Sequence, residues 1–373
     1  MWKLIDTVDC FISEDFGFSP TISIFSFIGT IVKKVDKTDN SLNYIYNFNL
    51  INDKISFINN NGGSIIVIDS FNSPNIDNIK CAFETFHKAI KCPVIVLFST
   101  LRNKYSKPFT GTWNILRLLY KKQKKTIKKN LSLVIGNRAG RKAKKDKDCS
   151  DRAFAHNLEI NFTTPEKFFM NDMKFYEWSW CPNMLNKASK EKLLDNKTKV
   201  PIIIDEINQL PKSEKYTIII TGSPSCGKTT LSNKIKRKWE QEYKTPSETL
   251  SDNILDHDNI ILKLHEYLSA NKSVIIDLLC SYDKILQIIK KSMENFTPIM
   301  IIEIITSFQI VQLLDHIKVQ SSTDSKTQVL NKIYWSQYYK KYIKPKYDIP
   351  CVRYIEFPLV LNPREEIWME YSY

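Results

Sequence analysis

A short glycine-containing segment constrains this chain more than any other feature of its sequence. Gly222–Thr229 matches the pattern G-x-x-x-x-G-K-[S/T] in full. The apolar run Tyr216–Ile220 precedes the segment, and an amphipathic helix is predicted from Lys228 to about Glu242. A strand that passes through a glycine turn into a helix is the context that this pattern requires. We therefore predict a P-loop domain of the α/β class.

The composition of this loop predicts which atoms would hold a phosphate group. Glycines let the backbone curl so that successive N–H groups point at phosphate oxygens, and the helix N-terminus adds its positive end. Lys228 is placed to reach the β- and γ-phosphates, and the hydroxyl of Thr229 is placed to bind Mg²⁺. The expected nucleotide-binding residues are Gly222, Ser223, Pro224, Ser225, Cys226, Gly227, Lys228, Thr229 and Thr230.

The P-loop does not by itself distinguish a kinase from an ATPase or a GTPase. The guanine-recognition pattern Asn-Lys-x-Asp does not occur in the sequence, which argues against a GTPase. A kinase needs a carboxylate to orient its acceptor hydroxyl and take its proton. Asp277 is one candidate, because it ends a predicted strand at the sheet edge where ligands bind. The other candidates are Asp252, Asp256 and Asp258.

Alternating apolar runs and helical patterns predict two α/β units, each built on a wound parallel sheet. The length of 373 residues agrees with two domains. Predicted strands lie at Ile22–Phe27, Ser64–Ile68, Pro93–Phe98 and Ser132–Ile135, and then at Tyr216–Ile220, Ser273–Asp277 and Ile299–Ile304; a helix is predicted near Asp77–Ile90. We expect an N-terminal domain over residues 1–170, a linker over 171–215 and a C-terminal domain over 216–373.

Charge and cysteine content restrict the partners and the compartment. The net charge of +14 favours an anionic partner such as nucleic acid. No apolar run approaches the roughly 18 residues that span a bilayer, so we expect an intracellular protein without membrane association. The lysine clusters Lys121–Lys129 and Arg141–Lys145 favour the nucleus over the cytoplasm, unless they are simply solvated surface. The eight cysteines are scattered without a CxxC pair, so neither zinc nor disulfides are expected. The oligomeric state is left open.

Four segments of the N-terminal half, in order, resemble motifs of the polynucleotide kinase 3′-phosphatase family. Their family patterns are K-P-x-T-G-x-W, G-D-x-A-G-R, C-A-D-R-x-F-A-x-N-L and T-P-E-E-F-F. The matching segments are Lys107–Trp113, Gly136–Arg141, Cys149–Leu158 and Thr164–Phe169. The P-loop extends the resemblance into the C-terminal half, and the phosphopeptide-binding module of the animal enzymes has no counterpart here.

The resemblance implies a first domain of the haloacid-dehalogenase (HAD) type whose phosphatase motif, D-x-D-G-T, has degenerated. Ser26 stands in the place of the nucleophilic Asp and Ile28 in the place of the general acid, while Asn137 replaces a magnesium-binding Asp. Retained positions are the phosphate-binding Ser70 and Lys107, and the acidic Asp151. An isoleucine can neither donate a proton nor bind a metal, so we predict that the fold is kept and the phosphatase activity is lost. A nucleophilic Ser26 is the alternative.

For the second domain, the resemblance implies an ATP- and Mg²⁺-dependent kinase of 5′-hydroxyl DNA or RNA ends in nucleic-acid repair. The family's acceptor-activating Asp lies 25 residues before a second Asp at a strand end, which selects Asp252 relative to Asp277. The family's lid carries arginines, whereas the corresponding stretch Asp315–Gln320 keeps only Lys318 as a cation. The predicted catalytic residues are thus Asp252, Lys228 and Lys318. A lysine lacks the bidentate fork of an arginine, so turnover is expected to be weak or altered in substrate.

Two other functions stay open at this point. One is a binding protein for nucleotide or nucleic acid in which both sites have decayed, and the other is a bifunctional 3′-phosphatase and 5′-kinase. A stripe of aromatic residues interleaved with lysines could stack on single-stranded ends, although we favour a place in the core. Its members are Tyr334, Trp335, Tyr338, Tyr339 and Tyr342.

Overall fold

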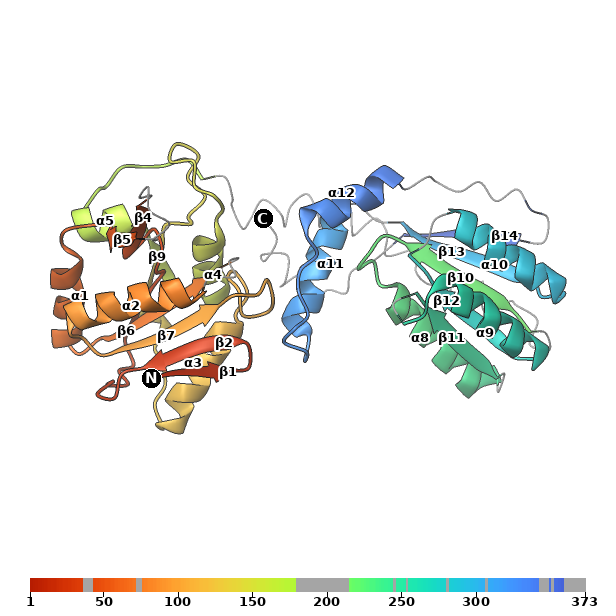
Figure 1. Cartoon of the computed structure of the whole chain (residues 1–373), viewed down its shortest axis with the longest axis horizontal. Coiled ribbons are helices and arrows are strands. Elements are labelled where there is room, and N and C mark those ends of the chain that lie inside the picture. Colours follow the sequence, from red (N-terminus) through yellow and green to blue (C-terminus); the bar gives the residue numbers. More distant parts are fainter. Residues whose placement is uncertain are drawn as a thin grey trace. The chain divides into compact units, whose positions relative to one another are not determined.

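The computed structural model describes residues 1–35, 43–71, 76–178, 215–243, 246–252, 254–279, 282–305, 308–341, 349 and 352–358. They form two compact units (Figure 1). The first unit holds the described residues of Met1–Leu185 and His316–Val329, and the second those of Asn186–Asp315 and Leu330–Glu366. Most of the linker expected over residues 171–215 lies outside the described residues.

The first unit is built on a seven-stranded sheet in the order β1-β2-β7-β6-β3-β8-β9. Strands β3, β6, β7, β8 and β9 are parallel, whereas β1 and β2 run antiparallel at one edge. The strands are β1 (Trp2–Ile5), β2 (Val8–Ile12), β3 (Ile22–Phe25), β6 (Ser64–Ser70), β7 (Val94–Ser99), β8 (Leu133–Ile135) and β9 (Asn161–Thr163). A separate antiparallel pair consists of β4 (Val32–Val35) and β5 (Asn43–Tyr46).

Helices cover both faces of this sheet and bury its apolar side chains. On one face, α3 and α4 contribute Trp113, Leu116 and Phe154 to the core. On the other face, α1, α2 and α5 contribute residues such as Phe83 and Phe169. Their bounds are α1 (Ile51–Asn60), α2 (Ile76–Ile90), α3 (Gly111–Lys122), α4 (Ser150–Leu158) and α5 (Pro165–Met170), with a 3₁₀ turn at Lys129–Leu131. The central strands are buried on both faces, which explains their continuous apolar runs.

The second unit is built on a five-stranded parallel sheet in the order β11-β12-β10-β13-β14. Its strands are β10 (Thr217–Gly222), β11 (Ser247–Ser251), β12 (Ser273–Asp277), β13 (Ile299–Ile305) and β14 (Val352–Pro358). Its helices are α8 (Lys228–Lys238, followed by a π-helical turn at Trp239–Tyr243), α9 (His257–Ser269), α10 (Tyr282–Glu294), α11 (Phe308–Ser321) and α12 (Lys332–Lys341). Helices α9 and α10 cover one face, and α8, α11 and α12 the other.

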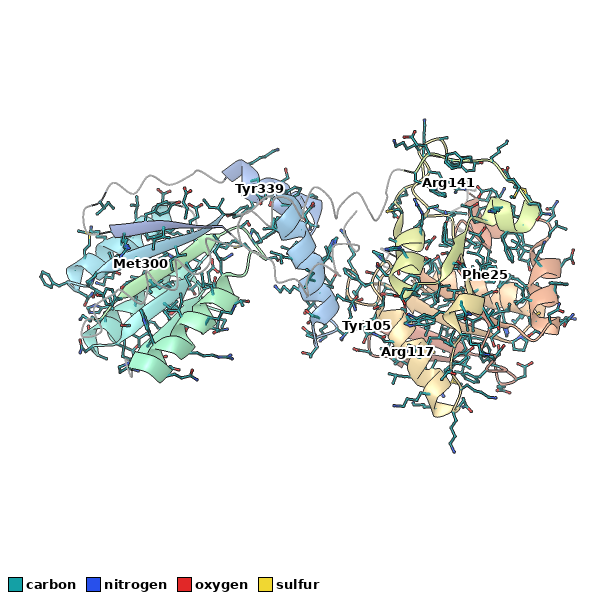
Figure 2. The ribbon with its side chains drawn as sticks, turned by 180° about the vertical axis from the view of Figure 1, so that it is seen from behind. Phe25, Tyr105, Arg117, Arg141, Met300 and Tyr339 are labelled. Atoms are coloured by element: carbon teal, nitrogen blue, oxygen red, sulfur yellow. The ribbon has the colours of Figure 1, made fainter. Side chains whose placement is uncertain are left out.

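Figure 2 shows where the labelled side chains of each unit lie: Phe25 within the first unit and Met300 within the second. Both residues are buried, at 0% and 1% exposure. They belong to β3 and β13, strands that the apolar runs predict. Continuous apolar strands thus form the centre of each sheet.

The α/β class and the parallel strands are confirmed, and the N-terminal sheet has two further antiparallel strands that the sequence did not predict. The hairpin of β1 and β2 adds two antiparallel strands at its edge. Asp6 provides the positive φ, +58°, that a tight hairpin turn needs. The hairpin is half exposed, so it lacks the long apolar run by which the inner strands are predicted. That this unit has a HAD-type fold stays a prediction.

Candidate functional sites

The P-loop of the second unit lies at the carboxyl end of β10, between β12 and β13 in the sheet. The order of the strands reverses at β10, and ligands of open α/β sheets bind at such switch points. Gly222 has a φ of +141°, and a Cβ there would come within 2.7 Å of the Ile304 carbonyl oxygen. Gly227 has a φ of +91° directly before α8. Backbone conformation therefore requires both glycines of the pattern, and close packing is a second reason at Gly222.

Lys228 is buried at the start of α8, with an exposure of 7%. Its ammonium group donates hydrogen bonds to the carbonyl oxygens of Gly222, at 3.2 Å, and Ser223, at 2.9 Å. Both partners are neutral and belong to the loop itself. The positive charge is thus held inside the loop by weak acceptors, which a phosphate oxygen can replace.

Thr229 and Asp277 meet beside Lys228. The Thr229 hydroxyl donates to one carboxylate oxygen of Asp277, at the end of β12, while the other oxygen, Oδ1, is buried and has no hydrogen-bond partner among the described residues. Burial raises the pKa of Asp277, although the hydrogen bond from Thr229 and the charge of Lys228 oppose this. A buried carboxylate oxygen without a partner, next to a hydroxyl, is a donor set that fits Mg²⁺. Among the described residues, no three His, Cys, Asp or Glu side chains gather as a metal site.

The three other acidic candidates occupy different positions in the structure. Asp252 follows β11, and its carboxylate accepts a hydrogen bond from the backbone N–H of Leu279 at 2.5 Å. The backbone N–H of Asp252 donates to the carbonyl of Asp277 at 3.2 Å, which holds these two residues at the same sheet edge. Asp256 instead caps the N-terminus of α9, where it accepts from the N–H of Asn259. Asp258 is exposed in the first turn of α9.

The remaining loop residues and Lys318 have different surroundings. Ser225, with a φ of +57°, donates to the Asp315 carboxylate at 2.9 Å. Ser223, Pro224 and Cys226 are buried, whereas Thr230 is exposed. Burial raises the pKa of the Cys226 thiol, so this thiol is an unreactive part of the core. Lys318 is exposed on α11, in the part of that helix that belongs to the first unit.

The aromatic stripe on α12 is part of the core at one ring and exposed at others. Trp335 is buried at 2% exposure, but Tyr334 and Tyr339 are each 38% exposed. The ring of Tyr339, labelled in Figure 2, packs edge-on against Phe308 with centroids 5.3 Å apart. Burial raises the pKa of Tyr334, and the charge of Asp252 adds to this effect. Tyr334 is therefore an exposed ring within the electrostatic range of Asp252. Tyr342 lies outside the described residues.

In the first unit, a second buried lysine lies at a second switch point, because β3 has β6 on one side and β8 on the other. The Lys107 ammonium donates to the Ser26 hydroxyl at 2.7 Å and forms an ion pair with Asp151. Burial alone would raise the pKa of Asp151, but Lys107 and Arg138 hold it below its usual value. The Lys107 N–H also donates to the Ser70 hydroxyl at 2.8 Å. Four of the positions implied by the resemblance are thus joined in one network.

Asn137 and Ile28 lie at the same edge of the first sheet. A Cβ on Gly29, whose φ is +81°, would come within 2.2 Å of the Asn137 amide nitrogen, so a glycine is needed here. The Asn137 Oδ1 atom is buried, and no residue in the described part of the chain binds it. A single amide oxygen is a weaker ligand for a divalent cation than a carboxylate. The side chain of Ile28 packs against the apolar core.

Sequence reasoning missed Asp69, the most enclosed carboxylate of this site together with Asp151. Asp69 is 1% exposed at the end of β6, and its Oδ1 lies 3.7 Å from the Lys107 ammonium. The rule that selects Asp277, an acidic residue at the end of an apolar strand, applies equally to Asp69. Its position next to Ser70 could therefore have indicated it.

Both units are thus parallel or mostly parallel α/β domains with a buried lysine at the switch point of the sheet. Residues 21–169 match the family model described as polynucleotide kinase 3 phosphatase. Over 201 residues, the chain is 30% identical to the bifunctional polynucleotide phosphatase/kinase of Schizosaccharomyces pombe, covering 53% of this chain and 43% of that protein. Residues 21–169 of this chain are therefore similar to the polynucleotide kinase 3′-phosphatase family.

Other similarities are shorter or weaker. The chain is 36% identical over 94 residues to an uncharacterized 20.8 kDa protein of Autographa californica nuclear polyhedrosis virus, covering 24% of this chain and 50% of that protein. It spans at most half of the length of either curated relative. Residues 215–341 match a family model described as ethanolamine utilisation - propanediol utilisation.

Two solved structures are similar to part of the chain. Kti12 of Chaetomium thermophilum, in complex with ADP-AlF3, is 14% identical with a TM-score of 0.31, covering 41% of this chain and 95% of that one. A gluconokinase of Sinorhizobium meliloti is 10% identical with a TM-score of 0.28, covering 42% of this chain and 89% of that one.

The five cysteines that the structure describes, Cys10, Cys81, Cys92, Cys149 and Cys226, are free thiols. No described helix has the length and apolar character that crossing a bilayer requires.

Proposed function

We propose that the second unit is an ATP-dependent kinase that phosphorylates 5′-hydroxyl ends of DNA or RNA. The observation that carries this proposal is the position of Asp252, whose carboxylate lies at the sheet edge shared with Asp277 and the P-loop. A carboxylate beside a phosphate-binding loop is what a hydroxyl acceptor requires. The polynucleotide kinase/phosphatase relative and the positive net charge support a nucleic-acid substrate.

Each residue has a separate task in the proposed reaction. The loop N–H groups and Lys228 bind the phosphates, and Thr229 and Asp277 would hold Mg²⁺, which neutralises charge on the β- and γ-phosphates when it is bound. Asp252 orients the 5′-hydroxyl and accepts its proton as the oxygen attacks the γ-phosphorus. The bond between the γ-phosphorus and the bridging oxygen breaks, and ADP leaves. The role of Lys318 in stabilising the transferring group stays a prediction.

We also propose that the first unit does not hydrolyse 3′-phosphates. The Ser26 hydroxyl accepts from a lysine that is already paired with Asp151, so no base activates it. Ile28 cannot act as a proton donor. An oligonucleotide with a 3′-phosphate should therefore release no inorganic phosphate in the presence of Mg²⁺, and release above a buffer blank would contradict this part of the proposal.

The kinase is tested by transfer of a labelled γ-phosphate from ATP to 5′-hydroxyl oligonucleotides of DNA and RNA. We expect transfer by the wild type and a loss of about 10²–10⁴-fold for Asp252→Asn, the range for a general base. Asp256→Asn is the matched control, because the same change at the cap of α9 keeps a side-chain oxygen for capping. Absence of transfer to all DNA and RNA ends would contradict the proposal.

The competing function is a binding protein whose sites have decayed. The observation in its favour is that Lys228 already has two acceptors in its own loop. Titration with ATP and an oligonucleotide gel shift separate the two functions. Binding of both ligands without any transfer identifies the binding protein, whereas transfer identifies the kinase.

A further inference from the structure

Three backbone hydrogen bonds and one ion pair at the carboxyl edge of the first sheet converge on one carboxylate, that of Asp69. Its Oδ2 accepts from the backbone N–H groups of Phe27, at 2.9 Å, and Ile28, at 3.0 Å. Its Oδ1 accepts from the N–H of Ser70 at 2.8 Å and lies 3.7 Å from the Lys107 ammonium. Asp69 is 1% exposed, so solvent contributes little to this arrangement.

The same donors would form an anion-binding site if Asp69 were absent. Consecutive backbone N–H groups that point into one concavity bind anions, and an adjacent ammonium group adds a full positive charge. The loop of Phe27 and Ile28 follows β3, the strand at which the order of the sheet reverses. This is the edge at which open α/β sheets bind their ligands. Donors and position therefore both indicate a site for an anion.

Ser70 and Lys107 at this edge are also engaged within the protein. The Ser70 hydroxyl accepts from the Lys107 N–H, and the Ser70 carbonyl oxygen lies 3.3 Å from an Arg138 guanidinium nitrogen. The Lys107 ammonium is shared between Ser26 and two carboxylates. A phosphate group that entered here would have to displace the buried carboxylate of Asp69 and lose these bonds.

We infer that Asp69 is an internal ligand of this anion-binding site and closes it to phosphate monoesters. The first unit then retains the donors of a phosphate site but supplies its own anion to them. This inference concerns the first unit alone and does not depend on the kinase activity proposed for the second. It predicts that a smaller, neutral residue at position 69 creates a site for a phosphate-sized anion.

The test compares the wild type with Asp69→Ser in the full chain, with inorganic phosphate as the probe. Because the P-loop of the second unit also binds anions, the readout must be local to Ile28. Labelling with ¹³C-carbonyl phenylalanine and ¹⁵N-isoleucine marks only the three Phe-Ile pairs, at Ile12, Ile28 and Ile58. In Asp69→Ser, the Ile28 amide signal should shift with phosphate in a saturable way while Ile12 and Ile58 stay fixed.

Two further measurements complete the test. In the wild type, we expect the Ile28 signal to stay unchanged up to about 50 mM phosphate, since binding should be at least tenfold weaker than in Asp69→Ser. Asp69→Asn is the matched control, because its amide oxygen still fills the site and accepts hydrogen bonds; it should bind less phosphate than Asp69→Ser. Saturable binding at Ile28 in the wild type, or an unchanged Ile28 signal in folded Asp69→Ser, would overturn the inference. If Asp69→Ser does not fold, Asp69→Ala takes its place, and the same two outcomes at Ile28 support or overturn the inference.

Discussion

The two units place a buried lysine at the same point of an α/β sheet but surround it with different acceptors. Lys107 is paired with Asp151 and lies near Asp69, both of them buried carboxylates. Lys228 has only the backbone carbonyls of Gly222 and Ser223 as hydrogen-bond partners among the described residues. A lysine whose charge is neutralised holds a fold together, whereas a lysine on neutral carbonyls keeps its charge for an incoming phosphate.

This difference suggests how one unit can lose its chemistry while keeping its fold. In the first unit, the lysine and two carboxylates form a closed network whose members stabilise one another. In the second unit, the carboxylate of Asp277 keeps an oxygen that no described residue binds, and the loop keeps its glycines. The two lysines should therefore respond in opposite ways to the same substitution.

The largest effect is expected for Lys228→Met. This change removes the cation that neutralises the transferring phosphoryl group, so phosphoryl transfer should fall by about 10³-fold, or about 4 kcal/mol in the activation free energy. The stability of the second unit should change little, because only hydrogen bonds to carbonyls within the loop are lost. Steady-state rates measure the transfer, and thermal unfolding measures the stability. Transfer by Lys228→Met at the wild-type rate would contradict the role that distinguishes Lys228 from Lys107.

Lys107→Met should show the opposite result: unchanged transfer but a loss of about 3–5 kcal/mol in the stability of the first unit. The reason is that Asp69 and Asp151 would be left buried without their cation. Hydrogen exchange of the β6 amides measures this free energy. Lys142→Met is the control, because Lys142 pairs with Glu177 on the surface and its loss should have little effect.

The pH dependence of this loss follows from Asp151. Burial alone would raise its pKa, but Lys107 and Arg138 lower it below the value of about 3.9 for an unfolded chain. The pair therefore stabilises the fold fully above that value and loses its effect as the pH falls through the folded pKa. The cost of Lys107→Met should therefore stay constant down to about pH 5 and shrink as the pH falls below about 4. An equal cost at about pH 3 and at pH 7 would contradict an ion-pair origin.

The sequence could predict those parts of the fold whose pattern lies within one continuous segment. Buried strands such as Ser64–Ser70 and Ile299–Ile305 have long apolar runs, and the P-loop has its own pattern, so these were predictable. The hairpin of β1 and β2 is half exposed and was missed.

The candidate sites likewise contain residues that the sequence could predict and residues that it could not. The spacing from Asp277 indicated Asp252, but the placement of Asp69 depends on contacts between residues 42 positions apart. Residue spacing does not reveal such a contact. Helical spacing likewise cannot tell how deeply each ring of α12 is buried: Trp335 is 2% exposed, whereas Tyr334 and Tyr339 are each 38% exposed.

A smaller effect is expected for Thr229→Val, which removes the hydroxyl next to Asp277 but keeps the shape of the side chain. If this hydroxyl binds Mg²⁺, the concentration of Mg²⁺ needed for half-maximal transfer should rise about tenfold. Thr230→Val is the matched control, because Thr230 is the next exposed residue of α8. An equal change in both variants would show that the effect does not come from metal binding.

The smallest effect is expected for Tyr334→Ala, which tests whether the exposed ring near Asp252 receives a base of the acceptor strand. Stacking of one base on an aromatic ring is worth about 1 kcal/mol at the lower end, so the KM for the oligonucleotide should rise about fivefold. Tyr334→Phe keeps the ring and should behave as the wild type, and Ile333→Ala removes a neighbour that is 68% exposed and should have no effect. The KM for ATP should stay constant in all three variants. A rise in the KM for ATP alone would assign the ring to the donor nucleotide. An equal rise in the KM for the oligonucleotide in Tyr334→Phe and Tyr334→Ala would show that the hydroxyl, rather than stacking, is responsible.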